Sequence, residues 1–267
     1  MTVSSWLQAA KTQLESAGIA TARLDSLILL EDETSKDRAW LLAYPEHTLQ
    51  ESEIKHLNTK LKQRGLHVPL AYIRGKAEFY RREFTVSEHT LVPRPETETM
   101  IDILKQLDLQ PGAQLFDIGT GSGCIAITAA LELHNVQVSA CDIDKRCLAT
   151  AAVNATKLGA EVTFLESDLL ESAQPCNILL ANLPYVPDNF QINIAATHEP
   201  RRALFGGRDG LDLYRKLFEQ LEASKWQPSY IIVESLPLQH EVLTEIAKAA
   251  GFALRKTDDF IQLFEPA

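Results

Sequence analysis

The first third of the chain carries apolar residues at helical spacing. The first such stretch ends before Gly18, and the apolar positions that repeat every three or four residues in it are Trp6, Ala9, Ala10 and Leu14. Similar patterns predict three further helices, which begin near residue 21, cover 39–43, and run from about 51 to 65. The last one opens with acids and closes with basic residues, as the helix dipole favours. We therefore expect a small helical bundle over residues 1–73.

The pattern changes after the bundle. Aromatic and aliphatic residues between Ala77 and Leu91 are interleaved with the polar stretch Arg81-Arg82-Glu83. This interleaving is typical of a short β-hairpin. Residues 74–93 are accordingly interpreted as a hairpin linker between two domains.

Strand-like and helix-like patterns alternate over the remainder, residues 94–267. Short apolar runs predict strands at 115–118, 136–141, 162–165, 177–181, 230–234, 252–256 and 260–264. Helical periodicity lies between them, at 123–133, 145–158, 211–221 and 238–250. Alternation of this kind predicts an α/β fold with a doubly wound, mainly parallel sheet. Ligands of such sheets bind at the carboxyl ends of the strands.

Composition narrows the class of protein. The 267 residues include 45% apolar residues, yet no apolar run approaches the ~20 residues that cross a bilayer. The N-terminal ten residues lack the basic start and apolar core of a secretory signal, so we expect no membrane association and a cytoplasmic protein. The four cysteines form no C-x-x-C pair, and we assign neither a disulfide framework nor a metal.

The charge balance argues against a nucleic-acid substrate. Lys and Arg number 26 against 36 Asp and Glu, which gives a net charge of −10. Two basic clusters could still form local patches, although solvated faces explain them as well, and we favour that interpretation slightly for the first. They are Lys55, Lys60, Lys62 and Arg64, and Arg74, Lys76, Arg81 and Arg82. Because phosphate neutralisation dominates binding to nucleic acid, we expect no direct nucleic-acid substrate.

A glycine-rich loop follows the first strand of the predicted sheet. It consists of Gly119, Thr120, Gly121, Ser122 and Gly123. Glycines there allow the backbone to turn sharply and to approach a ligand closely. The next helix presents free N–H groups and the positive end of its dipole. The loop predicts a cofactor site.

Two cofactors fit this loop. Gly121 to Ala126 satisfies G-x-G-x-x-A, and Asp142, at the end of the next strand, is well spaced to bind the ribose of NAD. The same carboxylate can accept hydrogen bonds from the ribose of S-adenosylmethionine. Asp117, just before the glycines, favours S-adenosylmethionine, because an acid can meet the cationic amino-acid end directly or through water but has no obvious use beside a pyrophosphate.

The tetrapeptide Asn182-Leu183-Pro184-Tyr185 follows the fourth strand of the sheet and is therefore expected at the same edge. A planar amide or aromatic amine is a weak nucleophile, because its lone pair is delocalised. The Asn182 side-chain oxygen and the Leu183 carbonyl can bind its N–H groups and direct the lone pair towards a methyl donor. Pro184 stiffens the turn and holds Leu183 extended, and Tyr185 can stack on the planar group. Asn and Pro are also common in ordinary turns, so the position after the strand carries this interpretation.

With these motifs the chain resembles the release factor glutamine methyltransferases, the PrmC/HemK family. Besides the loop and the tetrapeptide, the resemblance rests on four further stretches. They are 69–75, Glu78-Phe79-Tyr80, Pro93-Arg94-Pro95-Glu96-Thr97-Glu98, and 199–211 with Glu199-Pro200-Arg201, Gly206-Gly207 and Asp209-Gly210-Leu211. The arginine-proline and double-glycine stretches are far more specific than the loop.

The resemblance implies N5-methylation of the glutamine in the Gly-Gly-Gln motif of bacterial peptide-chain release factors. It further implies a helical N-terminal domain that binds the release factor and a seven-stranded, Rossmann-like class I methyltransferase domain. By the same resemblance, Gly119 to Gly123 and Asp142 bind S-adenosyl-L-methionine, and Asp168 and Leu169 flank its adenine. Residues 182–185 bind the glutamine, and 94–98 lie beside the site.

Three positions depart from the family pattern. Leu183 stands where the family usually has a first proline, Glu234-Ser235-Leu236 replaces Glu-Ile-Gly, and the C-terminal segment after Asp258 lacks the usual glycine and arginines. A backbone carbonyl is what position 183 must supply, so activity is expected to survive. Two alternatives stay open: a nucleic-acid adenine or ribosomal-protein glutamine methyltransferase, and a non-catalytic relative that only binds the cofactor.

Overall fold

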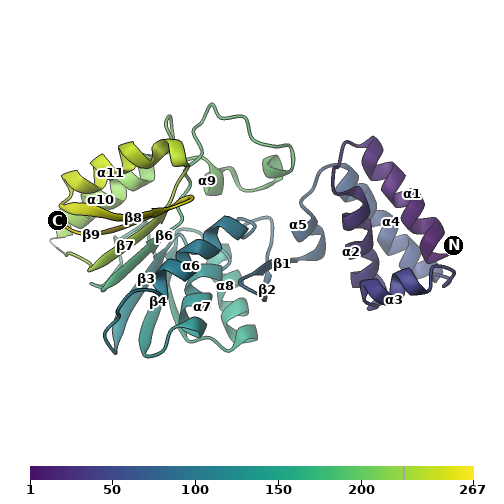
Figure 1. Cartoon of the computed structure of the whole chain (residues 1–267), viewed down its shortest axis with the longest axis horizontal. Helices are drawn as coiled ribbons and strands as arrows, with labels where there is room; N and C mark the ends of the chain where they lie inside the picture. Colours follow the sequence, from purple (N-terminus) through teal and green to yellow (C-terminus); the bar gives the residue numbers. More distant parts are fainter. Residues whose placement is uncertain (225) are drawn as a thin grey trace. The chain divides into compact units, whose positions relative to one another are not determined.

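The computed structural model describes residues 1–224 and 226–267 (Figure 1). The described chain divides into two compact units. The first comprises Met1–Gly75 with Asn193–His198, and the second comprises Lys76–Ile192 with Glu199–Ala267. No helix among the described residues is long and apolar enough to cross a membrane.

The first unit is a helical bundle, as the periodicity predicts. Its helices are α1 (Val3–Ser16), α2 (Ala22–Thr34), α3 (Arg38–Ala43), α4 (Glu51–Gly65) and α5 (Leu70–Arg74). The short helix α5 was not expected from the sequence. A 3-10 turn, η2 (Ala195–His198), also belongs to this unit.

One apolar core holds the bundle together. Trp6, Ala10 and Leu14 of α1 are buried in it, whereas Ala9, expected on the same face, is exposed. The indole Nε1 of Trp6 donates to the Asn58 side chain on α4 at 3.0 Å. A buried indole N–H needs such a partner, so this bond fixes how α1 packs on α4.

The second unit is built on a seven-stranded sheet in the order β5-β4-β3-β6-β7-β9-β8. The strands are β3 (Ala113–Ile118), β4 (Val136–Asp142), β5 (Val162–Glu166), β6 (Ile178–Ala181), β7 (Tyr230–Glu234), β8 (Phe252–Asp258) and β9 (Ile261–Pro266). The strands from β5 across to β7 pair in parallel, and β9 is antiparallel to both β7 and β8. The predicted doubly wound, mainly parallel sheet is confirmed.

Helices cover both faces of this sheet (Figure 1). The helices are α6 (Glu98–Leu104), α7 (Cys124–Glu132), α8 (Lys145–Leu158), α10 (Asp212–Ser224) and α11 (His240–Ala249). Side chains alternate along a strand, so Ile178 and Leu180 of β6 pack with α6 and α7, while Leu179 and Ala181 pack with α10. Burial on both faces explains why β6 is an unbroken apolar run in the sequence.

Shorter elements complete the unit. The predicted hairpin is present as β1 (Lys76–Phe79) and β2 (Arg82–Thr85), which pair antiparallel and belong to the second unit. The 3-10 turns η1 (Pro95–Thr97) and η3 (Pro237–Gln239) precede α6 and α11, and α9 covers Arg201–Leu204. The sequence patterns do not distinguish η1, α6 or α9 from loops.

The divergent C-terminal segment closes the sheet normally. Asp259, between β8 and β9, takes a left-handed conformation with φ of 50°. Aspartate tolerates this region better than most residues, so it can occupy a turn position that favours glycine. The departure from the family pattern therefore leaves the β9–β8 edge of the sheet intact.

Candidate active site

A pocket lies at the carboxyl ends of β3, β4, β5 and β6. β3 is flanked by β4 on one side and by β6 on the other, so the chain reverses its direction across the sheet here. Such a reversal opens a crevice where ligands bind in doubly wound folds. Ten of the residues proposed from the sequence line the pocket: Gly119, Thr120, Gly121, Ser122, Asp142, Asp168, Leu169, Asn182, Leu183 and Pro184.

The glycine loop forms one wall. Gly121 has φ of 57°, and a Cβ added there would meet no heavy atom within 4 Å, so its backbone faces open space. Gly123 is different and does not line the pocket. A Cβ at Gly123 would lie 2.8 Å from Ile127 Cδ1 and 3.0 Å from Ala151 Cβ, so this glycine permits close packing of α7 on α8. We interpret Gly123 as a packing residue, not as a ligand of the cofactor.

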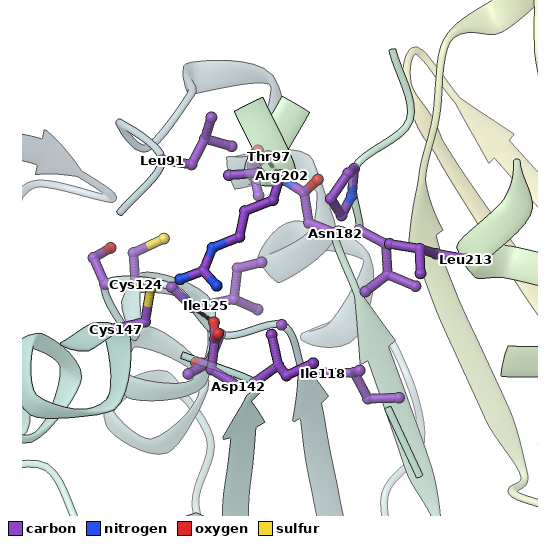
Figure 2. A pocket seen from close by; sticks show the side chains of 18 of the residues that line it. Leu91, Thr97, Ile118, Cys124, Ile125, Asp142, Cys147, Asn182, Arg202 and Leu213 are labelled. Atoms are coloured by element: carbon purple, nitrogen blue, oxygen red, sulfur yellow. Dashed lines mark hydrogen bonds between the residues drawn. The ribbon is translucent and has the colours of Figure 1, made fainter. Parts of the chain in front are cut away.

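Asp142 ends β4 and ties the loop to the sheet (Figure 2). The backbone N–H of Gly121 donates to its Oδ2 at 2.9 Å, and that of Asp144 donates to its Oδ1 at 2.8 Å. A carboxylate has about four acceptor positions, so two remain for ligand hydroxyls. Burial raises the pKa of Asp142, opposed by the backbone N–H groups of Gly121 and Ile143 and by the Arg202 cation.

Asp117 is fully buried and does not reach the pocket surface. Asp117 and Ile118 are neighbours on β3, so their side chains point to opposite faces of the sheet. Ile118 lines the pocket, whereas the Asp117 side chain points towards α7. The Thr120 hydroxyl donates to Asp117 Oδ2 at 2.6 Å, while Oδ1 has no partner among the described residues. Burial raises its pKa to about 7. Direct contact with a ligand, one of the two routes expected from the sequence, therefore does not fit this geometry.

Asp168 and Leu169 follow β5 and line the opposite side of the pocket. The Lys216 ammonium on α10 pairs with Asp168 Oδ2 at 2.5 Å. Ser167 was not expected from the sequence, yet it lines the pocket and donates to the Leu169 carbonyl at 3.0 Å. Together with apolar Ile143 and Leu213, these residues offer a mixed surface suited to a planar heterocycle.

Asn182 stands directly after β6 and lines the pocket (Figure 2). Its amide Nδ2 donates to Thr97 Oγ1 at 3.1 Å across 85 positions of sequence. Thr97 comes from η1, in the arginine-proline stretch, so that stretch lies beside the site as expected. With Nδ2 engaged in this way, the amide oxygen is left as an acceptor.

The backbone of Leu183 is anchored by the buried side chain of Tyr214. The Leu183 N–H donates to the Tyr214 hydroxyl at 3.3 Å, and that hydroxyl donates to the Glu234 backbone oxygen, with the Ala181 backbone oxygen also within hydrogen-bond distance. No hydrogen bond to the Leu183 carbonyl is formed within residues 1–224 and 226–267. A carbonyl oxygen beside the pocket thus stays available to a substrate.

Tyr185 does not line the pocket. Its hydroxyl donates to Glu234 Oε1 at 2.8 Å, at the carboxyl end of β7. Burial, together with the Glu234 carboxyl, raises the pKa of this phenol above its ordinary value. Stacking of Tyr185 on a substrate stays a prediction, whereas the described structure gives it an anchoring contact.

Two glycines support the tetrapeptide from behind. A Cβ at Gly206 would overlap the carbonyl oxygen of Pro184, and one at Gly210 would overlap that of Tyr185. The Gln239 amide also donates to the Tyr185 carbonyl at 2.8 Å. The double-glycine stretch is therefore required for direct contact between two backbones.

An ion pair between distant motifs lies beside the pocket, and its Arg94 member lines it. Arg94 Nη2 donates to Glu199 Oε1 at 2.5 Å, and the backbone N–H of Val92 donates to Glu199 Oε2 at 3.1 Å. Glu199 is buried, so it joins the two specific stretches tightly. Arg202 extends over the pocket (Figure 2). Its guanidinium pairs with the Asp144 carboxylate.

Sequence reasoning left several of these residues without a role. Thr97, Tyr214 and Gln239 act through contacts across long sequence separations, which give no local pattern. Glu234 could have been proposed from the sequence, because it is an acid at the end of a buried apolar strand, as Asp142 is. Within the described residues, no group of three or more His, Cys, Asp or Glu is placed to hold a metal ion.

Comparisons with known proteins agree with this geometry. Residues 5–75 match the PrmC N-terminal domain family, and residues 97–199 match the methyltransferase small domain family. A release factor glutamine methyltransferase of Koribacter versatilis is 36% identical over 262 residues, covering 92% of this chain and 91% of the relative. One of Bacillus subtilis is 34% identical over 245 residues, covering 87% and 84%.

Among solved structures, the hMettl16 catalytic domain in complex with an RNA hairpin has a TM-score of 0.54 at 13% identity, with 82% of each chain covered. This likeness supports the fold alone. The two bacterial relatives, in contrast, match over most of their own length as well as most of this chain. The chain belongs to the release factor glutamine methyltransferase family.

Proposed function

We propose that this protein transfers a methyl group from S-adenosyl-L-methionine to the side-chain amide nitrogen of the glutamine in the Gly-Gly-Gln motif of bacterial peptide-chain release factors. The observation that carries the proposal is the pair of free acceptors after β6. The Asn182 amide oxygen and the Leu183 carbonyl stand beside the glycine loop in a chain of this family.

The two acceptors match the chemistry of a primary amide. Its nitrogen carries two N–H groups, and its lone pair is delocalised into the carbonyl. Acceptors that bind both N–H groups fix the orientation of the nitrogen, so that its lone pair is aimed at the methyl donor. Alignment of this kind supplies much of a rate enhancement. No general base is required beforehand, because the nitrogen becomes acidic only as it gains the methyl group.

The pocket residues fit the cofactor, which supplies an electrophilic methyl group on a sulfonium. Asp142 retains acceptor positions for ribose hydroxyls, and Gly121 leaves room for close approach. Asp168 and Leu169 would flank the adenine. The buried Asp117 carboxyl lies beneath the loop, and in its ionised form it can act on the cationic amino-acid end through water.

The helical unit supplies the second part of the proposal. We assign residues 1–73 to recognition of the release factor, with 74–93 as the linker and 94–267 as the catalytic domain. Several members of the two basic clusters are engaged in ion pairs: Lys60 with Glu33, Arg64 with Asp25, Arg74 with Asp32 and Arg82 with Glu132. Paired cations neutralise phosphates poorly, which favours a protein substrate over a nucleic acid.

A labelling experiment tests the proposal. Purified protein is incubated with methyl-labelled S-adenosyl-L-methionine and either a bacterial release factor, the same factor with its motif Gln→Ala, or total RNA. Label is expected in the unmodified release factor alone. Transfer to RNA or to ribosomal protein, without transfer to the release factor, would instead support the alternative substrates. Cofactor binding without labelling of any acceptor would indicate a non-catalytic relative.

A further inference from the structure

Two buried polar groups beside Asn182 have no part in the chemistry described so far. One is the Thr97 hydroxyl on η1, on a residue 2% exposed, and the other is the Glu234 carboxyl at the end of β7, on a residue 1% exposed. Burying an acid is costly unless it serves a set of hydrogen bonds. Their position next to the acceptor residue suggests which set that is.

The side-chain amide of Asn182 can in principle be placed in two orientations, which exchange its oxygen and its NH2 group. The oxygen and the NH2 group of an asparagine amide occupy nearly the same shape, and only their partners decide which points where. The substrate amide brings N–H groups, so Asn182 must present oxygen to it. A reversed amide would place donor against donor and lose the bond that holds the nucleophile.

Glu234 and Thr97 provide the required asymmetry. The Asn182 Nδ2 donates to Thr97 Oγ1 at 3.1 Å, which uses the Thr97 oxygen as an acceptor. The Thr97 hydroxyl proton is then free to point elsewhere, and the Glu234 carboxyl is within its reach. An ionised carboxylate accepts and never donates, so it draws the hydroxyl proton and favours the NH2 side of the amide.

The anchoring of Glu234 supports this arrangement. Tyr185 donates to its Oε1 at 2.8 Å, while Oε2 has no partner of good geometry among the described residues. Burial raises the pKa of Glu234, and the Thr97 hydroxyl, the Tyr185 hydroxyl and the Asn182 amide all oppose that rise. The carboxyl therefore faces three donors, and the ionised form is the one they favour.

We propose that Glu234 and Thr97 are positioning residues that lock the Asn182 amide with its oxygen towards the substrate nitrogen. This inference rests on the proposed function, because it assigns the polarity of that same acceptor site. Tyr185 takes part by fixing the carboxyl, which links both ends of the tetrapeptide to one buried acid.

Isosteric variants test the proposal. Glu234→Gln can direct its own NH2 towards Thr97, which lets the threonine donate to the Asn182 oxygen and reverses the amide. Thr97→Val removes the acceptor while keeping the shape, and Thr97→Ser restores it. For Glu234→Gln and Thr97→Val, kcat for release-factor methylation is expected to fall at least tenfold, about 1.4 kcal/mol. Thr97→Ser should keep kcat within about threefold of the unchanged protein.

Two further readouts separate positioning from loss of structure. The dissociation constant for S-adenosyl-L-methionine, measured by calorimetry, should stay within about twofold in each variant, since Asp142 and the loop are untouched. Thr128→Val is the matched control, because Thr128 is a buried threonine on α7 whose hydroxyl lacks a partner among the described residues. It should retain full kcat.

The double variant Thr97→Val with Glu234→Gln tests whether Thr97 and Glu234 act together on the Asn182 amide. Its kcat should be no lower than that of the worse single variant, because both changes disturb the same amide. Multiplied losses would overturn the coupling, and single variants with kcat within about twofold of the unchanged protein would overturn the positioning role. Failure of the unchanged protein to methylate release factor would refute the proposed function instead.

Discussion

Replacing Asp117 by asparagine should change how the stability of the protein depends on pH. Asp117 is fully buried on β3, and burial raises its pKa from 3.8 to about 7, against the opposing hydrogen bond from Thr120. In the unfolded chain the carboxyl ionises near 3.8. Between these two values the folded state binds more protons, so the free energy of unfolding falls as pH rises.

The magnitude follows from the two pKa values. A difference of about 3 units at 1.36 kcal/mol per unit amounts to ~4 kcal/mol once the pH exceeds both values. Between about pH 5 and about pH 8 the expected loss of stability from this one group is ~2.5 kcal/mol. An asparagine side chain carries no charge, so the Asp117→Asn variant lacks this contribution. Any lost hydrogen bond in the variant shifts its curve by an amount independent of pH.

Urea unfolding at half-unit pH steps measures the effect. The difference in unfolding free energy between the unchanged protein and Asp117→Asn should move by ~2.5 kcal/mol in favour of the variant across that range. Asp259→Asn, at the exposed turn between β8 and β9, controls for the removal of one charge and should give a flat difference. Parallel curves for the unchanged protein and Asp117→Asn would show that Asp117 ionises as freely in the fold as outside it.

Three further predictions concern the site. Asn182→Ala should lower kcat at least ~100-fold while S-adenosyl-L-methionine still binds in calorimetry, because the acceptor of one substrate N–H is gone; full turnover would refute that role. Asp142→Ala should weaken cofactor binding ~10–100-fold through loss of charge-assisted bonds, and an unchanged dissociation constant would show that the ribose lies elsewhere. Gly210→Ala should reduce stability by ~1–3 kcal/mol in thermal unfolding, since its Cβ would overlap the Tyr185 carbonyl; Gly112→Ala, also left-handed but in open space, is the control that should lose less.

Local sequence patterns predicted most of the helices and strands of the fold. The strand, glycine loop and helix around residues 113–132 are contiguous in sequence, so their order alone predicted both the elements and the pocket wall. The tetrapeptide was placed correctly for the same reason, because a residue that follows a parallel strand lies at its carboxyl edge.

Predictions were weaker where side-chain direction or distant contacts decide the outcome. Asp117 was expected to act on the ligand directly or through water, and its position on β3, with the side chain turned towards α7, does not fit the direct route. Thr97 meets Asn182 across 85 positions, and Arg94 meets Glu199 across 105. No periodicity encodes such pairs, since they depend on how separate elements pack in space. The double-glycine stretch was likewise recognisable as a motif, but its purpose needed the overlap with the Pro184 and Tyr185 carbonyls.

The close contact of Gly206 and Gly210 with those carbonyls has a consequence for sequence drift in this family. The carbonyls of Pro184 and Tyr185 are positioned by backbone against backbone and the Leu183 N–H by the Tyr214 hydroxyl, so the side chain at position 183 has only to fill a buried apolar space. That position can exchange a proline ring for a leucine without redirecting the oxygen that matters. We expect substitutions to be tolerated less well at Gly206, Gly210 and Tyr214, although none of these residues touches the substrate. A search for distant family members should therefore give these positions more weight than position 183.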